Sequence, residues 1–397
     1  MQKNSWTWNT DPARALPSLR LLDSLDALHG ADWDALHDGN NPFISHAFLS
    51  GLERHGCLKP AWGWRPRHAA LYEGDTLVAA APAYLKGNSH GEFVFDHAWA
   101  QAYARYGQDY FPKWLVAVPY SPVAGPRLLS ADPSMRALLA SELIEKAERD
   151  GLSSVHANFL REAELDAFDR RWLSRGDVQF HWRNDAGWQD FDQFLGAFTS
   201  RKRKTVRAER EQVRRAGIEF RLAHGDEACA DDLSAMHDFY CITQQEKGNQ
   251  PVLTLAFFHH LAETMPRQLL LILARREGRS IAGALCLRGG ETLYGRYWGA
   301  SEVVPGLHFE TCYYQGIDYC LREGLKCFEP GAQGEHKIAR GFLPVLTHSR
   351  HFVSDPSFAN ALRPWCEEER SSVLRYRDVV LEHSPFREPI ADPAPRG

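Results

Sequence analysis

The sequence predicts an α+β fold with two domains, each a mixed, mostly antiparallel sheet flanked by helices. One reason is length, because 397 residues are more than one small hydrophobic core normally serves. Another is that the same order of elements, namely hairpin, strand, helix and strand, is expected twice along the chain. The residue identities do not repeat, so the duplication concerns architecture and not a tandem sequence repeat.

In the first domain, residues 1–188, the hairpin is expected at residues 68–86, where a Glu-Gly-Asp turn separates two apolar runs. The apolar run at 114–125 predicts a buried strand. Residues 133–151 have helical periodicity and end at a glycine, which favours a helix. Further strands are expected at residues 153–160 and 178–184.

The second domain, residues 217–397, repeats this order after helices at 231–248 and 253–265. Residues 269–300 contain apolar runs separated by Arg-Glu-Gly-Arg and Gly-Gly turns, which predicts a meander of three strands. The remaining elements are a helix that ends at a glycine, a short strand and a helix in the tail, at residues 308–324, 326–330 and 356–386.

Composition and charge indicate which classes of partner and site are not expected. The net charge of −5 gives no global attraction to nucleic acid or to anionic membranes. No apolar run approaches the ~20 residues that span a bilayer, and the N-terminus lacks the apolar region of a secretory signal. The eight cysteines are scattered and form no Cys-x-x-Cys pair. Reduced core thiols in the cytoplasm are therefore expected, with no metal site and no tightly bound cofactor.

The densest polar stretch is FEPGAQGEHKIARGF, residues 328–342, directly after an expected strand. Ligands bind beyond strand ends in open sheets, so this stretch is expected to form one wall of an active cleft. Glu335 or His336 would accept a proton from an amine. Lys337 and Arg340 would contact an anion. The alternative is a polar turn whose charges pair with one another on a short helix.

Other residues of the same stretch, and the start of the next-to-last helix, complete the catalytic hypothesis. Gly334 allows close approach of backbone, and Gln333 would offer an amide donor toward an oxyanion. His308 and Glu310 lie in the first turn of the expected helix, where Glu310 would orient the acceptor amine. The alternative for Glu310 is an acid that only interacts with the helix dipole.

Candidate binding residues also occur in the first domain. Asp96 and His97 follow an apolar run and could form a proton relay, or a buried hydrogen-bonded pair that shapes the loop. Arg183, in a strand near the domain junction, could face the cleft. Both features are hypotheses about ligand contact that depend on where the fold places these side chains.

A basic helical connector is expected at residues 189–216, with eight basic and two acidic residues between positions 201 and 215. Arg203 and Arg207 share one helix face, which we expect to border the groove between the domains. The functional interpretation is contact with a polyanionic donor: tRNA, a lipid-linked diphosphate or coenzyme A. The alternative is a solvated face with intrahelical pairs such as Arg207–Glu211.

The order of elements resembles that of acyl-CoA N-acetyltransferase (GNAT) modules. Six segments extend the resemblance to predicted N-acyltransferases described as peptidoglycan biosynthesis/recognition proteins, which combine GNAT and Fem-like features; they are residues 92–107, 110–129, 178–185, 200–210, 304–315 and 328–344. The resemblance implies paired GNAT domains. The phosphate loop of such modules, Q/R-x-x-G-x-G/A, is replaced here by EVVPGLHFE, whose Glu302 and Glu310 would repel a pyrophosphate.

The leading hypothesis is therefore an N-acyltransferase that transfers an acyl or aminoacyl group to an amine acceptor. The donor would be a CoA thioester, with acyl-CoA as co-substrate, or an aminoacyl-tRNA-like molecule. The absence of a Cys/His motif favours direct transfer over a covalent thiol intermediate. The rival hypothesis is a non-catalytic GNAT pair that recognises a cell-envelope precursor or a protein partner.

Overall fold

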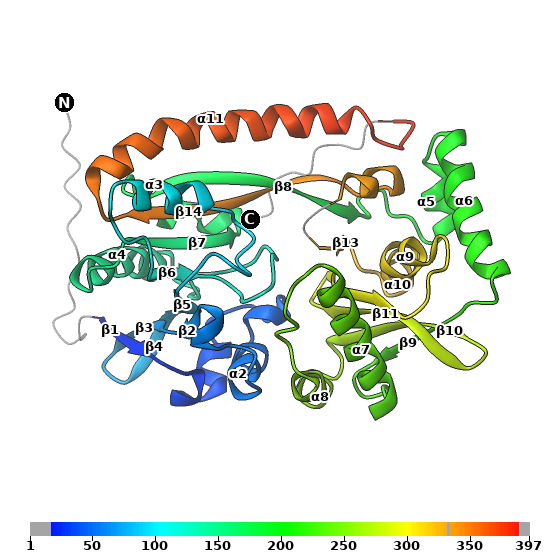
Figure 1. Cartoon of the computed structure of the whole chain (residues 1–397), viewed down its shortest axis with the longest axis horizontal. Coiled ribbons are helices and arrows are strands. Elements are labelled where there is room, and N and C mark those ends of the chain that lie inside the picture. Colours follow the sequence, from blue (N-terminus) through cyan, green and yellow to red (C-terminus); the bar gives the residue numbers. More distant parts are fainter. Residues whose placement is uncertain (1–16, 332–333, 389–397) are drawn as a thin grey trace.

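The computed structural model of the chain describes residues 17–331 and 334–388 (Figure 1). The α+β fold is confirmed. The described residues form a large mixed sheet of eleven strands, in the order β2-β5-β6-β7-β14-β8-β13-β12-β11-β10-β9, and a small sheet in the order β1-β3-β4. Helices cover these sheets, and the large sheet passes from the first half of the chain into the second.

The first half supplies one end of the large sheet and all of the small one. Its strands are β1 (Ser18–Leu22), β2 (Trp64–Pro66), β3 (His68–Glu73), β4 (Thr76–Ala81), β5 (Ala83–Lys86), β6 (Lys113–Val116), β7 (Ser154–Leu160) and β8 (Leu173–Arg183). Its helices are α1 (Gly30–Asp34), α2 (His46–Arg54), α3 (His97–Arg105) and α4 (Pro133–Arg149). The expected hairpin and long helix are present, whereas the buried strand expected at residues 114–125 is confined to Lys113–Val116.

The second half supplies the other end of the large sheet. Its strands are β9 (Glu219–His224), β10 (Leu269–Arg276), β11 (Arg279–Arg288), β12 (Thr292–Ala300), β13 (Cys327–Glu329) and β14 (Leu343–Val353). Its helices are α5 (Phe191–Gly196), α6 (Ser200–Arg215), α7 (Ala230–Glu246), α8 (Leu255–Thr264), α9 (Leu307–Phe309), a π-helix (Glu310–Tyr314), α10 (Gln315–Arg322), a 3-10 helix (Glu335–Arg340) and α11 (Pro356–Leu381).

Each half contains one parallel strand pair joined by a helical crossover. In the first half β6 pairs with β7 and α4 lies between them in sequence. In the second half β12 pairs with β13, and the connection is the continuous helical segment from α9 to α10. These crossovers are the GNAT-like element of each half, as the sequence predicted.

The last strand of the chain belongs to the first half. β14 lies between β7 and β8 and is antiparallel to both. β8 is long enough to pair with β14 along Leu173–His181 and then with β13 at Trp182 and Arg183. Residues 343–353 lay outside every element that the sequence predicts. The domain boundaries at residues 188 and 216 stay a prediction, because strand pairing crosses them.

The basic helix α6 is present, but the prediction that it borders the groove between the domains is wrong. It lies at the outer end of the second half, beyond α9 and α10, and not beside the first half (Figure 1). Val206 and Val213 bury its apolar side in the second half. Its side-chain partners there include Glu310, Asp318 and Arg340.

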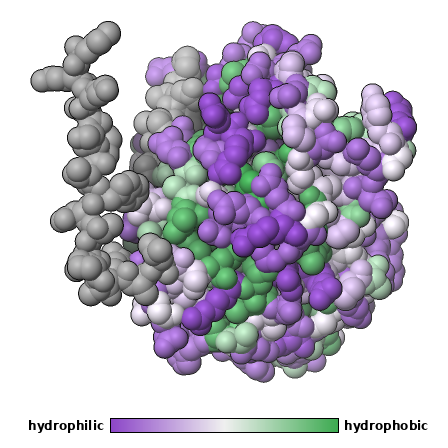
Figure 2. All heavy atoms as spheres, turned by 90° about the vertical axis from the view of Figure 1, so that its left-hand side faces the viewer, coloured by the Kyte–Doolittle hydropathy of each residue, from purple (hydrophilic) through white to green (hydrophobic). Residues whose placement is uncertain are grey.

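The long helix α11 crosses the molecule over β8 and β14 (Figure 1). Asp355 caps its N-terminus by accepting from the backbone N–H groups of Ser357 and Phe358. Figure 2 shows the end of the molecule at the left of Figure 1, where a band of apolar side chains runs between hydrophilic ones. Among the helices of residues 17–331 and 334–388, none combines the length and the apolar composition that crossing a membrane requires.

Candidate active site at the divergence of β12 and β13

The strands β12 and β13 separate soon after they meet. Their parallel pairing covers only residues 292–294 and 327–329, whereas β12 continues to Ala300 beside β11. Pro330 and Gly331, which has a φ of 96°, turn the chain away from β12. Gly295 faces this turn, and a Cβ atom there would lie 3.3 Å from Pro330 Cα. We call residues 295–297 and 329–331 the divergence point.

Two cations lie at the divergence point without a carboxylate partner in the described residues. Lys337 is 2% exposed, and its Nζ donates to the Gly331 carbonyl oxygen at 2.7 Å. Arg296 Nη2 donates to the Tyr120 carbonyl oxygen at 2.9 Å, and its buried Nε has no hydrogen-bond partner. Burial lowers the pKa of Arg296 and lowers that of Lys337 to about 8. An unpaired buried cation is costly, so this place favours a negatively charged or polarised ligand group.

Glu329 ends β13 at the same place. Its side chain is 12% exposed, and its Oε2 is buried without a hydrogen-bond partner. Burial raises the pKa of Glu329 to about 8 against the attraction of Arg296, so the carboxyl group is protonated at neutral pH. His181 Nδ1 lies 4.0 Å from Glu329 Oε1, and burial lowers the pKa of His181 to about 3.

His181 and Glu329 form, with Cys327, a group whose ligand atoms lie within 4.8 Å of one another. Such a group could hold a metal ion by ligand type. The charge of Arg296 acts on Glu329, and the charge of Lys337 acts on His181. These uncompensated cations disfavour a further positive ion here.

Two imidazoles lie beside the divergence point. The rings of His308 and His336 are 6.1 Å apart, and His336 Nε2 is 2.8 Å from the Tyr313 hydroxyl. The His308 ring also contacts Trp298 on β12 at 5.2 Å. Burial lowers the pKa of His336 and lowers that of His308 to about 4. Both rings are therefore neutral near pH 7 and able to accept a proton.

Arg340 stabilises the wall of the site and is not a free anion contact. Its Nη2 donates to Glu209 on α6 at 2.6 Å, and its Nη1 donates to the His336 carbonyl oxygen at 2.7 Å. The guanidinium lies over the Phe309 ring, 3.4 Å from the centroid. Arg340 thus connects the 3-10 helix to α6 and to α9.

The two acidic catalytic candidates do not meet at this site. Glu310 is buried on the other side of its helix, where it accepts from Arg210 at 3.0 Å and from Gln315 at 2.8 Å. Glu335 points toward α11 and accepts from the Tyr376 hydroxyl at 2.6 Å. The hypothesis that Glu310 and Glu335 belong to one catalytic site is therefore wrong, because Glu310 is held by Arg210 of α6 and Glu335 by Tyr376 of α11.

Asp96 and His97 do not form a pair. Asp96 is buried and accepts from Lys113, from Ser89 at 2.5 Å and from Tyr110 at 2.6 Å. His97 begins α3 and stacks on Phe95 at 5.9 Å between ring centroids. The proton relay and the buried Asp96–His97 pair are therefore both wrong, because Lys113, Ser89 and Tyr110 are the partners of Asp96.

The remaining candidate binding residues lie at the surface or outside the described residues. Arg183 pairs with Asp185 at 2.8 Å, and Arg207 pairs with Asp192 at 3.2 Å. The expected Arg207–Glu211 pair is wrong, because Glu211 accepts from Arg214 and Arg215. Arg203 lies on the half-exposed side of α6. Gln333 lies outside the described residues, and Gly334, with a φ of 119°, contacts the His336 ring.

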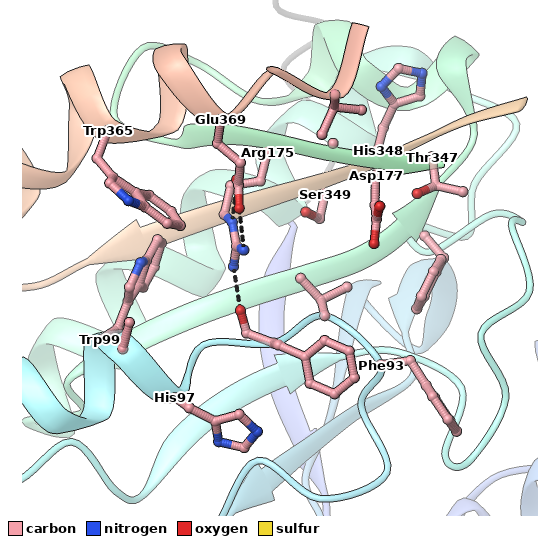
Figure 3. A pocket seen from close by; sticks show the side chains of 16 residues that line it. Phe93, His97, Trp99, Arg175, Asp177, Thr347, His348, Ser349, Trp365 and Glu369 are labelled. Carbon is pink, nitrogen blue, oxygen red and sulfur yellow. Dashed lines mark hydrogen bonds and ion pairs between the residues drawn. The ribbon is translucent and has the colours of Figure 1, made fainter. Parts of the chain in front are cut away.

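A groove lies between the loop of residues 87–96, the β8–β14 strands and α11. It consists of adjoining cavities of about 370 and 310 Å³, which share Phe93, Phe95, Phe159, Asp177 and Thr347. Figure 3 shows the larger cavity, with the Arg175 guanidinium beside both the Trp99 and the Trp365 ring. The smaller cavity reaches Gly334 and Glu335, which directly precede His336. We call the two cavities together the acceptor groove.

The family model for FemAB-like proteins, described as peptidoglycan biosynthesis/recognition, matches residues 24–388. The chain belongs to this FemAB-like family. A comparison with curated proteins gives no match.

Several solved structures resemble the FemAB-like chain at low identity. FemX shares 12% identity with a TM-score of 0.49, and the match covers 85% of this chain and 98% of FemX. L-PGS from Bacillus licheniformis shares 11% with a TM-score of 0.48, over 84% and 98% of the chains. A tandem GNAT protein from the clavulanic acid biosynthesis pathway shares 12% with a TM-score of 0.43, over 86% and 99%.

Sequence reasoning missed residues that this FemAB-like chain brings to the divergence point. Arg296 lies in the expected meander, and Glu329 lies in the stretch expected to form the cleft wall but has no role of its own in that prediction. His181 was read as part of a strand near the domain junction. A signal for Arg296 exists, because a cation within the run TLYGRYWGA contradicts a wholly apolar strand.

Proposed function

We propose that this FemAB-like protein is an N-acyltransferase that passes an acyl or aminoacyl group to an amine. The observation that carries the proposal is the pair of unpaired cations, Lys337 and Arg296, at the divergence point. Acyl transfer places negative charge on a carbonyl oxygen in its tetrahedral state, and fixed cations in a buried site stabilise that charge. Family membership supports this choice.

The proposed reaction takes place between the divergence point and the acceptor groove. The amine nitrogen attacks the donor carbonyl carbon, and the bond from that carbon to the leaving oxygen or sulfur breaks. In the tautomer in which His336 Nε2 donates to the Tyr313 hydroxyl, Nδ1 accepts the amine proton. Glu329, protonated at neutral pH, gives a proton to the leaving group. His336 then passes its proton on to restore the protonated form of Glu329, so both residues regain their starting states and the transfer balances.

The acceptor groove supplies the entry for the amine. Gly334 and Glu335 line its inner end and are joined to His336 through the backbone. In this proposal the amine passes Gly334 to the His336 side of the 3-10 helix and meets the acyl group of the donor at the divergence point. Such an arrangement aligns the two reactants, which is a main source of acceleration in group transfer.

The donor is proposed to be an acyl-CoA or an aminoacyl-tRNA. Glu302 pairs with Arg276 and Glu310 with Arg210, so neither carboxylate faces a pyrophosphate unpaired. Gly306, with a φ of 82°, is the glycine before α9. Basic side chains on α6 offer a surface for a larger polyanion. None of the eight cysteines forms a disulfide in the described residues, which supports our proposal of a reducing compartment, the cytoplasm.

The test is acyl transfer by the purified full chain, measured by mass spectrometry of the amine product. Acetyl-CoA, long-chain acyl-CoA and aminoacyl-tRNA serve as donors, each with a panel of primary amines. Lys337→Met and His336→Ala are expected to lower the rate by about 10²-fold or more. Lys326→Met removes a surface lysine that pairs with Glu291 and serves as the control. Turnover that is unchanged in both site variants would contradict the proposed roles.

The rival function, recognition without catalysis, gives a different result in the same samples. A binder is stabilised against heating by a cell-envelope precursor, and it forms no product with any donor. An enzyme is stabilised by its donor and consumes it. The sequence EVVPGLHFE stands where the glycine-rich phosphate loop is expected, and this difference is the reason to test recognition without catalysis.

A further inference from the structure

Strand periodicity brings a set of polar side chains together on one face of the large sheet. Ser349 and His351 lie two residues apart on β14, so they share a face. The register places His156 of β7 opposite His351, and Arg175 of β8 opposite Ser349. Side chains directly opposite each other on antiparallel strands are near neighbours. These side chains therefore meet, although they come from three strands that are far apart in sequence.

Hydrogen bonds connect the serine to a pair of imidazoles. His351 Nε2 lies 2.8 Å from Ser349 Oγ, and the Nδ1 atoms of His351 and His156 are 2.7 Å apart. The two histidines are 0% and 1% exposed, and burial lowers the pKa of both, so each neutral ring carries one proton. A hydrogen bond between the Nδ1 atoms needs a proton on one ring and a lone pair on the other. The tautomer of one imidazole therefore fixes that of its partner.

Tyr110 and Asp96 determine which tautomer is present. Against the effect of burial, the charge of Lys113 and its hydrogen bond lower the pKa of Asp96, so this carboxylate can only accept. The Tyr110 hydroxyl donates to Asp96 at 2.6 Å, and its oxygen lies 3.2 Å from His156 Nε2. Because the hydroxyl proton already points to Asp96, His156 Nε2 carries the proton of its ring and donates to Tyr110 and to Ser154 Oγ, which is 2.8 Å away.

This tautomer makes Ser349 the donor to an imidazole. With its proton on Nε2, His156 accepts at Nδ1 from His351 Nδ1. His351 Nε2 is then a lone pair and accepts from the Ser349 hydroxyl. A hydroxyl that donates to an imidazole, which itself donates to a fixed acceptor, is the arrangement that activates a serine as a nucleophile. Here the fixed acceptor is a second imidazole, held by Tyr110 and Asp96.

Ser349 also lies at a cavity large enough for a ligand. Figure 3 shows it between Arg175 and Asp177 at the larger cavity of the acceptor groove, about 370 Å³ in volume. The Trp99 ring contacts the His351 ring at 5.4 Å between centroids and lines the same cavity. An apolar acyl group suits such walls. The apolar lining consists of Phe93, Val94, Phe95, Trp99, Trp365 and Val373.

Arg175 offers donors to the oxyanion that forms when a serine attacks a carbonyl group. Its Nε and Nη2 each donate to Glu369, and its Nη1 donates to the Phe95 carbonyl oxygen. A guanidinium has five N–H groups, so one on each Nη remains without a partner in the described residues. Arg175 is the direct cross-strand neighbour of Ser349, which places these donors beside the reacting oxygen.

Asn158 of β7 is a second donor beside Ser349. Arg350 pairs with Ala157, and the next positions on the two strands are Ser349 and Asn158, where the pairing becomes irregular. Asn158 is 1% exposed, and neither its Nδ2 nor its Oδ1 has a hydrogen-bond partner within the described part of the chain. A buried amide without partners costs stability, and an oxyanion that accepts from Nδ2 gives a reason to keep it.

We propose that Ser349 is a nucleophile that takes the acyl group of an ester with an apolar acyl chain and passes it to water. Ser349 Oγ forms a bond to the carbonyl carbon, and His351 Nε2 takes the hydroxyl proton. The bond from that carbon to the leaving oxygen breaks, and His351 gives the proton to this oxygen. Water then attacks the Ser349 ester in the same way, which releases a carboxylic acid and restores the hydroxyl. This activity goes beyond the proposed amine acylation, whose residues at the divergence point take no part.

The first test is labelling of the full chain with a fluorophosphonate, which forms a covalent bond to an activated serine and releases fluoride. Peptide mass spectrometry is expected to find the adduct at Ser349. Ser349→Ala should abolish this adduct. His351→Gln retains a polar side chain that cannot take the proton, and it should slow labelling by about 10²-fold or more. Ser280→Ala, at a half-buried serine on β11, is the matched control and should label at the rate of the parent protein.

Ester hydrolysis supplies the second test. The substrates are p-nitrophenyl octanoate and p-nitrophenyl acetate, without any amine, and the release of p-nitrophenolate is measured. The octanoate should have a kcat/KM about tenfold or more above that of the acetate, because its chain contacts the apolar walls. Ser349→Ala should lower hydrolysis of the octanoate by about 10²-fold. Circular dichroism and urea denaturation confirm that each variant is folded.

No adduct at Ser349 in the folded parent protein would overturn the inference. An unchanged labelling rate in folded His351→Gln would do so as well, as would ester hydrolysis that Ser349→Ala retains. The parent protein and Ser349→Ala decide the question even where His351→Gln does not fold. Because no amine is present, these outcomes are separate from those of the proposed function. Labelling and hydrolysis at Ser349 without amine acylation would contradict only the proposed function.

Discussion

The two parallel strand pairs of this molecule end in different ways. Each pair is joined at only three positions, in β6–β7 and in β12–β13. The chain that follows β6 comes back into contact with β7, where the Gly125 N–H donates to the Phe159 carbonyl oxygen at 3.0 Å. This contact closes the space where β6 and β7 separate. Arg127, fully buried beside it, donates to the carbonyl oxygens of Asn158, Pro126 and Val123. After β12 no comparable closure occurs within the described residues.

The buried lysines show the same contrast. Lys113 in the first half lies between Glu92 and Asp96, which both accept from its ammonium group. Among the described residues, Lys337 in the second half donates only to the Gly331 carbonyl oxygen. The first half has thus compensated its buried charge and serves as a scaffold. The second half leaves charge uncompensated, which costs stability and is typical of a functional site.

The largest effect is expected from breaking the compensated half. Lys113→Met removes the cation that hydrogen-bonds both Glu92 and Asp96, and should lower the free energy of unfolding by about 3–5 kcal/mol. Urea denaturation measures the change. A loss below 1 kcal/mol would show that this network does not stabilise the first half.

The corresponding change in the second half should act on function instead. Lys337→Met is expected to lower the acyl-transfer rate by about 10²–10³-fold, because it removes a fixed positive charge near the developing oxyanion. The same variant should be as stable as the parent or more stable, since an unpaired buried charge is replaced by an apolar side chain. Comparing denaturation with turnover on one preparation separates the two effects, and a strongly destabilised but active variant would reverse the assignment.

Glu329 predicts a pH dependence of stability. Its pKa of about 8 in the folded chain exceeds the ordinary value of 4.5, so the folded state holds an extra proton between these values. The free energy of unfolding therefore falls as pH rises from 4.5 to 8, by at most about 1.4 kcal/mol per pH unit from this group. Glu329→Gln should remove that slope, and urea denaturation of both proteins across this range is the measurement. Parallel curves would contradict the shifted pKa.

The smallest effect is expected at α6, away from both strand pairs. Arg203→Glu and Arg207→Glu together should weaken binding of an anionic donor only about two- to fivefold at low salt, because exposed charges are screened. The effect should disappear near 1 M salt. Binding that is equally strong at low salt in the variant would show that this helix face only keeps the protein in solution.

The order of elements could be read from the sequence because it depends on local signals. Turns, glycine stops and apolar periodicity indicated the hairpins, the helix α4 and the short strand β13. β14 could not be recognised in this way. Its sequence LPVLTHSRHFV contains a proline and several basic residues, and its partners β7 and β8 lie more than 150 residues earlier. Pairing across that distance is fixed by tertiary structure and not by a local pattern.

The site was found in the right stretch but with a partly wrong composition. Glycines and charges between positions 331 and 340 pointed to the wall that holds His336 and Lys337. Spacing could not show that Glu310 faces α6, because the π-helix shifts the phase of its side chains. Arg296 was missed because its function depends on the separation of β12 from β13, which is a property of two strands together.

The position of β14 also has a consequence for how the protein is made. A ribosome releases residues 154–183 long before residues 343–353 are synthesised. The edges of β7 and β8 that will pair with β14 therefore stay unpaired during that time. Neither half can finish its sheet until nearly the whole chain has been synthesised. Loss of the last strand would therefore disable the first-made part of the protein as severely as the last. The half that is made first is therefore completed by one of the last strands to be made.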